Sequence, residues 1–156
     1  MTSDSEDAQI KICDFGFSTM IGPSETCERR CGTLGFTAPE ILLGWSYGSD
    51  VDVWSLGIIT YLLLSGCIPF NDKDDEELMR QTVQDYVHFK SKAWETISVE
   101  ATDFCLSLLT KSRSKRVNLE DIMNLSWFRD DDSIPKQESK EIFKTTGNRG
   151  KSQSPI

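Results

Sequence analysis

The feature that most constrains the fold is an uncharged stretch of the chain, Val53–Asn71. Its length is close to that of a membrane-spanning helix, so a membrane span is one interpretation. Gly66 ends the helical pattern early, which leaves an apolar helix of about 14 residues, a length typical of a buried core helix. A helix that is apolar on all its faces belongs at the centre of a domain. The stretch therefore predicts a central helix, Asp50–Ser65, with Ser49 or Asp50 as its N-cap, and it argues against a membrane span.

Shorter patterns predict a mainly α-helical fold around this helix. Pro39 suits the first turn of one short helix, and Gly44 suits its exit. Asn118 opens the last helix, with Asp121 three residues further on as the acid of a capping box. An alternating segment, Gln9–Cys13, predicts a short strand. The predicted helices besides the central one are Ala38–Leu43, Asp74–Val83, Ser98–Thr110 and Asn118 to about Trp127.

Length and charge narrow the class of protein. The chain has 156 residues and a formal net charge of −8. An acidic surface repels phosphate groups, so a nucleic-acid partner is not expected. Residues 1–8 are acidic and polar, and they show no secretory signal. The composition predicts an acidic lead-in at residues 1–8, one domain at residues 9–128 and a disordered tail at residues 129–156.

The five cysteines form no pattern typical of zinc binding. Cys27 and Cys31 are four residues apart, which resembles half of a metal site, but no second half follows and His88 is the single histidine. Free, reduced thiols are therefore expected, as in proteins of the cytosol or nucleus.

Short motifs follow one another along the chain in a fixed order. Asp14-Phe15-Gly16 alone is a weak signal, because a three-letter string occurs by chance in a chain of this length roughly 2% of the time. The motifs that follow it are Cys31-Gly32-Thr33, Ala38-Pro39-Glu40, Asp52-Val53-Trp54-Ser55-Leu56-Gly57, Pro69-Phe70, Trp94, Arg116 and Ser126-Trp127-Phe128. Together they resemble the C-terminal lobe of a eukaryotic protein Ser/Thr kinase, from its Mg²⁺-binding aspartate onward. The resemblance is to the calcium/calmodulin-dependent group, and the opening Asp-Phe-Gly-Phe-Ser is similar to the phosphorylase kinase catalytic subunit.

The resemblance implies roles for residues 14–40, which correspond to the activation segment of that family. Asp14 would hold Mg²⁺ against the phosphates of ATP, because a hard cation prefers carboxylate oxygen. The alternative for Asp14 is a plain turn aspartate before a glycine. Phe15 would pack differently in active and inactive states, and Gly16 would give the backbone freedom to aim Asp14. Thr33 lies where Ser/Thr kinases place a threonine that contacts the catalytic aspartate and lysine.

The resemblance also assigns residues to substrate binding and to support of the site. Leu34 and Thr37 would line the pocket for the residue that follows the phosphorylated one. Asp52 would cap the backbone of the catalytic loop from the central helix. Trp54 is expected in the core.

Two further expectations concern packing. Glu40 and Arg116 would form a buried ion pair that ties the activation segment to the last helices. Phe15, Leu34 and Phe36 would leave an apolar, uncovered face through which the chain associates.

The usual phosphorylation site of this kinase group is altered here. The regulatory threonine often lies two residues before the cysteine of Cys-Gly-Thr, and that position is Arg29 in this chain. Ser24 and Thr26 are the nearest hydroxyl groups and are the candidate phosphosites. An intact kinase is therefore expected not to need phosphorylation at the usual site.

Several kinase motifs are absent from this sequence: the G-x-G-x-x-G loop, the strand lysine with its helix glutamate, and the H-R-D-x-x-x-x-N catalytic loop. The sequence is therefore expected to begin inside a kinase fold. The intact kinase would use ATP and Mg²⁺ and phosphorylate proteins. This chain alone would be inactive and would bind ATP and Mg²⁺ weakly or not at all. The alternative, from another functional class, is a non-catalytic module that binds partners through the substrate-facing surface.

Overall fold

The computed structural model of the chain describes residues 10–22 and 25–129, which fold mainly into helices. The predicted lead-in at residues 1–8 and, apart from Arg129, the predicted tail lie outside these residues. The helices are α1 (Pro39–Leu43), α2 (Asp50–Ser65), α3 (Asp75–Gln84), η1 (Lys92–Glu95), α4 (Val99–Leu108), η2 (Leu119–Asn124) and α5 (Ser126–Arg129), with η marking a 3₁₀-helix.

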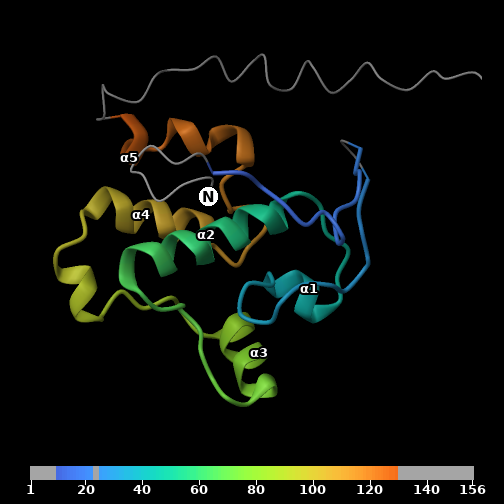
Figure 1. Cartoon of the computed structure of the whole chain (residues 1–156), viewed down its shortest axis with the longest axis horizontal. Helices are drawn as coiled ribbons and strands as arrows, with labels where there is room; N and C mark the ends of the chain where they lie inside the picture. Colours follow the sequence, from blue (N-terminus) through green and yellow to red (C-terminus); the bar gives the residue numbers. More distant parts are fainter. Residues whose placement is uncertain (1–9, 23–24, 130–156) are drawn as a thin grey trace, which may run out of the picture.

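Helix α2 crosses the middle of the fold, with α4 packed along it (Figure 1). It ends at Gly66, which adopts a left-handed conformation with φ of 75° and donates its N–H to the carbonyl of Leu62. Gly57 lets α4 come close, since a Cβ atom at this position would lie 2.8 Å from Cδ2 of Leu109. The prediction of a central helix with these bounds is confirmed.

One detail of that prediction is wrong, because α2 is not buried on every face. Val53, Trp54 and Ile58 are buried, whereas the side chain of Leu63 is 79% exposed. Ser49 is the N-cap of α2, which is one of the two predicted positions, but its side chain makes no capping hydrogen bond. None of the helices in the described ranges is long and apolar enough to cross a membrane.

Two apolar clusters hold the helices together. The larger one lies between α2, α4, η1 and the segment after α2, and the partly buried Leu34 and Phe36 pack against it. The smaller one joins α2 and α4 to the last two helices through Val53, Phe104, Leu108 and Ile122. The buried members of the larger cluster are Ala38, Trp54, Ile58, Tyr61, Phe70, Leu78, Trp94, Cys105 and Leu109.

Local sequence signals set the ends of three other helices. Pro39 stands in the first turn of α1, and Gly44 closes it with φ of 72° and an N–H bond to the carbonyl of Ile41. Ser98 caps α4 by accepting the N–H of Ala101 at 3.2 Å. Asp74 caps α3 in the same way, by accepting the N–H of Glu77 at 2.9 Å.

Two predictions of local structure are wrong. Residues 10–13 form no strand, and the described part of the chain offers them no partner strand, which a strand needs for its hydrogen bonds. The last helix is not continuous: η2 and α5 are separate, and Asn118 makes no side-chain cap. The capping box with Asp121 is therefore not formed.

Candidate functional site

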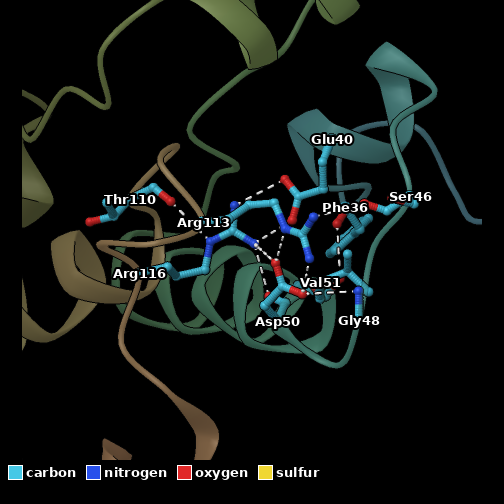
Figure 2. A network of polar contacts seen from close by, with 10 residues as sticks. Phe36, Glu40, Ser46, Gly48, Asp50, Val51, Thr110, Arg113 and Arg116 are labelled. Carbon is cyan, nitrogen blue, oxygen red and sulfur yellow. Dashed lines mark hydrogen bonds and ion pairs between the residues drawn. The ribbon is translucent and has the colours of Figure 1, made fainter. Parts of the chain in front are cut away.

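The side chain of Arg116 is the centre of a buried polar network (Figure 2). Its Nη1 and Nη2 donate to the two carboxylate oxygens of Glu40 at 2.7 and 3.1 Å, and the two side chains are 0% and 1% exposed. Nε donates to the carbonyl of Thr110 at 2.9 Å, and Nη1 also donates to the carbonyl of Asp50 at 2.9 Å. The guanidinium carbon lies 5.2 Å from the ring centroid of Trp54. The predicted pairing of Glu40 with Arg116 is thus present, and it joins α1 to the loop after α4.

A second arginine fixes the start of α2 from the same loop. Arg113 donates from Nε to Asp50 at 2.6 Å and from Nη2 to the other carboxylate oxygen at 3.0 Å, and its Nη1 reaches the carbonyl of Ser46 at 2.7 Å. Burial would raise the pKa of Asp50, but the hydrogen bonds and the charge of Arg113 outweigh it and lower that pKa. This clamp has no signal in the sequence, since a basic loop alone does not indicate which carboxylate an arginine reaches.

A hydrogen bond to α2 holds Phe36, near the end of residues 14–40. Ser55 donates its hydroxyl to the carbonyl of Phe36 at 3.0 Å, across 19 residues of sequence. Within the segment, the Thr37 hydroxyl donates to the carbonyl of Thr33 at 2.9 Å. Thr37 is buried, Leu34 is half-buried and Thr33 is exposed.

The Asp-Phe-Gly motif forms an exposed turn. Asp14 has a φ of 64°, in the left-handed region that aspartate tolerates better than most side chains. Its Oδ1 accepts the N–H of Gly16 at 3.3 Å. The turn continues with Ser18, whose N–H and hydroxyl both donate to the carbonyl of Phe15. The Phe15 side chain is 67% exposed, so Phe15 packs into neither apolar cluster.

The remaining predicted residues are dispersed. Asp52 lies on the exposed side of α2, where partial burial of its carboxyl group and the charge of Asp50 raise its pKa. Trp54 lies in the core, as expected, and its ring is parallel to that of Phe70. Thr26 is exposed, and Ser24 lies outside the described residues.

The residues present can be compared with the needs of Mg²⁺. Magnesium is often held by one or two carboxylates together with substrate phosphates. Asp14 offers one exposed carboxylate for that arrangement. The part of the chain that the structure describes has no group of three acidic, histidine or cysteine side chains that would hold a metal by itself. Asp14 therefore fits a cation whose other ligands come from a bound phosphate.

Comparison with known proteins decides the family. The protein kinase domain model matches residues 2–128 of the chain. The described part of that range contains the Asp-Phe-Gly turn, the buried Glu40–Arg116 pair and both apolar clusters. The chain belongs to the protein kinase family. Its mainly helical fold is that of the C-terminal lobe portion of such a domain.

Several kinases are similar in sequence. Myosin light chain kinase A of Dictyostelium discoideum is 34% identical over 148 residues, which are 95% of this chain and 50% of that protein. Calcium/calmodulin-dependent protein kinase type 1B of Rattus norvegicus is 38% identical over 131 residues, 84% of this chain and 38% of the relative. Calcium-dependent protein kinase 4 of Arabidopsis thaliana is 37% identical over 133 residues, which are 85% of this chain and 26% of that protein. The chain thus spans half or less of the length of these relatives.

Proposed function

We propose that this chain supplies the activation segment and helical lobe of an ATP-dependent protein Ser/Thr kinase of the calcium/calmodulin-dependent group. The observation that carries the proposal is the buried Glu40–Arg116 pair, which anchors the end of the activation segment to the helical core. Asp14 stands at the opposite end of that segment on an exposed turn, where a Mg²⁺–phosphate group from another part of the kinase can reach it.

The geometry supports distinct roles within the segment. Asp14 would hold Mg²⁺, which neutralises charge on the phosphates during phosphoryl transfer. Thr33, which is exposed, would contact the catalytic loop, and this favours Ser and Thr as substrates. Leu34 and Thr37 would shape the pocket for the next substrate residue, with Thr37 held by its bond to the Thr33 carbonyl.

The chain alone should show no kinase activity, because this sequence lacks the ATP-binding lysine and the catalytic-loop aspartate. Loss of a general base alone typically lowers a rate by about 10²–10⁴. Phosphate transfer to peptides should match that of a variant with Asp14→Asn, and ATP with Mg²⁺ should not raise the melting temperature. Turnover above this control, or a clear ATP-dependent shift, would contradict the proposal.

A chimaera tests the catalytic assignment directly. The part of calcium/calmodulin-dependent protein kinase type 1B that precedes the Asp-Phe-Gly motif is joined to residues 14–129 of this chain, which begin with that motif. We expect the chimaera to phosphorylate peptide substrates of that relative and the chimaera with Asp14→Asn to be inactive. Asp72→Asn, an exposed aspartate after α2, is the matched control and should keep activity.

A non-catalytic partner-binding module is the second candidate. The buried Glu40–Arg116 pair and the two apolar clusters favour it, because both are formed by residues of this chain. The same chimaera separates the two functions. A chimaera that folds and binds ATP but transfers no phosphate would support the module and reject the kinase assignment.

The proposed kinase would not need phosphorylation at the usual position of the activation segment. Arg29 occupies that position, and its guanidinium carbon lies 5.7 Å from the ring centroid of Phe17, next to the Asp-Phe-Gly turn. Its carbonyl accepts the hydroxyl of Tyr47. These contacts hold the loop without a phosphate group. The chimaera carrying Ser24→Ala and Thr26→Ala should therefore stay active; loss of activity that acidic substitutions restore would refute this.

A further inference from the structure

Residues 33–37 form a compact turn that closes on one carbonyl group. The carbonyl of Thr33 accepts the backbone N–H of Phe36 at 3.0 Å and the side-chain hydroxyl of Thr37 at 2.9 Å. Gly32 precedes the turn with a φ of 132°, and a Cβ atom there would lie 2.9 Å from Oγ1 of Thr37. These contacts define the turn within itself, but they do not fix its orientation on the helices.

One hydroxyl group of α2 reaches this turn. Oγ of Ser55 donates to the carbonyl of Phe36 at 3.0 Å, and it lies 3.2 Å from the carbonyl of Val51, four residues earlier in the same helix. A carbonyl inside a helix already accepts the N–H four residues further on, so Val51 does not depend on this hydroxyl. Among the hydrogen bonds that lie outside the helices of the described residues, no backbone N–H donates to the Phe36 carbonyl. Ser55 is therefore the donor that satisfies this carbonyl.

The apolar neighbours of the turn do not replace this bond. Leu34 and Phe36 pack against the larger cluster and stay partly buried. A Cβ atom at Gly35 would lie 3.6 Å from Cδ1 of Ile68, which is an ordinary van der Waals distance. Burial of apolar groups is non-directional, whereas a hydrogen bond has a preferred direction. The packing therefore holds the turn against the core, and the bond from Ser55 gives the turn its orientation.

We propose that Ser55 is a positioning residue for substrate selection. Its hydroxyl fixes the turn that carries Leu34 and Thr37, and it thereby shapes the pocket for the residue after the phosphorylated one. The role rests on the proposed kinase function, and it adds a residue that acts through Phe36. Without the hydroxyl the turn can shift, so the pocket should bind an apolar side chain less well.

The first test measures the anchor itself in the full chain and needs no kinase activity. Hydrogen exchange of the Phe36 amide, followed by NMR, should be about 3- to 10-fold faster in Ser55→Ala than in wild type, since one net hydrogen bond corresponds to a factor of that size. The Gly66 amide, which bonds to the carbonyl of Leu62 at the other end of α2, should exchange at the wild-type rate and so show that the variant is folded. An unchanged Phe36 rate would overturn the proposal.

Thr60 provides the matched control on the same helix. Its hydroxyl donates to the carbonyl of Leu56, four residues earlier, at 2.9 Å, which is a bond confined to α2. Thr60→Val removes the hydroxyl and nearly keeps the shape of the side chain, so the Phe36 amide should exchange at the wild-type rate. Equally fast exchange in Thr60→Val and Ser55→Ala would show that any hydroxyl lost from α2 loosens the turn, and the specific role of Ser55 would be wrong.

The second test measures substrate choice in the chimaera with calcium/calmodulin-dependent protein kinase type 1B. Two peptides are compared that differ only in the residue after the phosphorylated serine, which is leucine in one and glycine in the other. Ser55→Ala should raise the KM of the leucine peptide about 3- to 10-fold and leave its kcat and the KM of ATP near wild type. The kcat/KM values of the two peptides should therefore move closer together, whereas Thr60→Val should keep the wild-type preference.

The possible results separate this role from the proposed function. A Ser55→Ala chimaera that keeps the wild-type preference, or that loses kcat equally for both peptides, would overturn the positioning role and leave the kinase assignment standing. A wild-type chimaera that folds but transfers no phosphate would reject the kinase assignment and, with it, the role in substrate selection. The exchange rates would still decide whether Ser55 anchors the turn.

Discussion

A single guanidinium group, that of the buried Arg116, joins three parts of the chain. It contacts α1, the start of α2 and the start of the segment that follows α4, and it lies against Trp54 in the core. Because both members of its ion pair are buried, removal of one leaves an uncompensated charge in the interior.

Arg116→Met should therefore destabilise the chain by about 3–5 kcal/mol, the usual cost of breaking a buried pair. The double variant with Glu40→Leu should recover part of this loss, since it leaves no unpaired charge. The matched control is Arg80→Met, which breaks an exposed pair with Glu77 and should leave the urea unfolding midpoint nearly unchanged. If both single variants unfolded at the same urea concentration, burial would not be the source of the effect.

The clamp of Arg113 on Asp50 predicts a pH-dependent contribution to stability. The folded-state pKa of Asp50 is lowered, so the contribution is present above the ordinary value of 3.8 and is lost as the pH falls through the lowered value. The melting temperatures of wild type and Arg113→Gln should therefore differ at neutral pH and converge in acid. In a background with Asp50→Asn, the Arg113 substitution should have the same effect at every pH. A wild-type difference that does not change with pH would contradict the assignment.

At the scale of helices, local signals predicted most boundaries, because the residues that end a helix act on their immediate neighbours. Gly44 and Gly66 adopt the left-handed conformation that closes α1 and α2, and Ser98 caps α4. The strand predicted at residues 9–13 is absent from its described part, residues 10–13, because a strand depends on a partner elsewhere in the chain. Asn118 has the chemistry of a cap, but the segment after it winds as a 3₁₀-helix, and its side chain accepts no capping N–H.

The contrast between local signals and distant partners also holds for the candidate site. The pairing of Glu40 with Arg116 was accessible only through resemblance to a family, since the two lie 76 residues apart. The isolated backbone bridge between Cys27 and Tyr47 and the clamp on Asp50 had no local signal at all. Contacts of this kind are set by how the helices pack.

The contact between α2 and α4 can be tested at Gly57. A Cβ atom there would lie 2.8–2.9 Å from atoms of Leu108 and Leu109, which is too close for carbon atoms. Gly57→Ala should thus destabilise the chain by about 1–3 kcal/mol through overpacking, despite a gain of roughly 1 kcal/mol in helix propensity. Leu63→Ala on the exposed face of the same helix should change the unfolding midpoint little. A Gly57 variant more stable than wild type would show that the helices separate easily.

At the scale of the whole molecule, exposed apolar side chains are closely spaced at the start of the described residues. Five large apolar side chains within residues 10–20 are strongly exposed, and Met20 reaches 97%. The expected face of Phe15, Leu34 and Phe36 is corrected accordingly, because Leu34 and Phe36 pack partly on the core. The exposed set is Ile10, Ile12, Phe15, Phe17 and Met20.

This surface should make the chain associate, since apolar patches of this kind promote contacts between molecules. Sedimentation of the chain at increasing concentration should show species larger than a monomer. Combined replacement of Phe15, Phe17 and Met20 by Ser should shift the population toward monomer, whereas Tyr86→Ser, at an exposed aromatic side chain outside this segment, should not. A wild-type chain that stays monomeric at every concentration would contradict this.

The span between Glu40 and Arg116 also has a consequence in time. A ribosome adds roughly 5–20 residues per second, so several seconds pass between the synthesis of the two partners. During that interval the Glu40 carboxylate lacks the Arg116 guanidinium with which it pairs, and burial of the unpaired charge would be costly. The activation segment therefore stays open to water, and to any enzyme or chaperone that meets the nascent chain, until the residues after α4 have emerged.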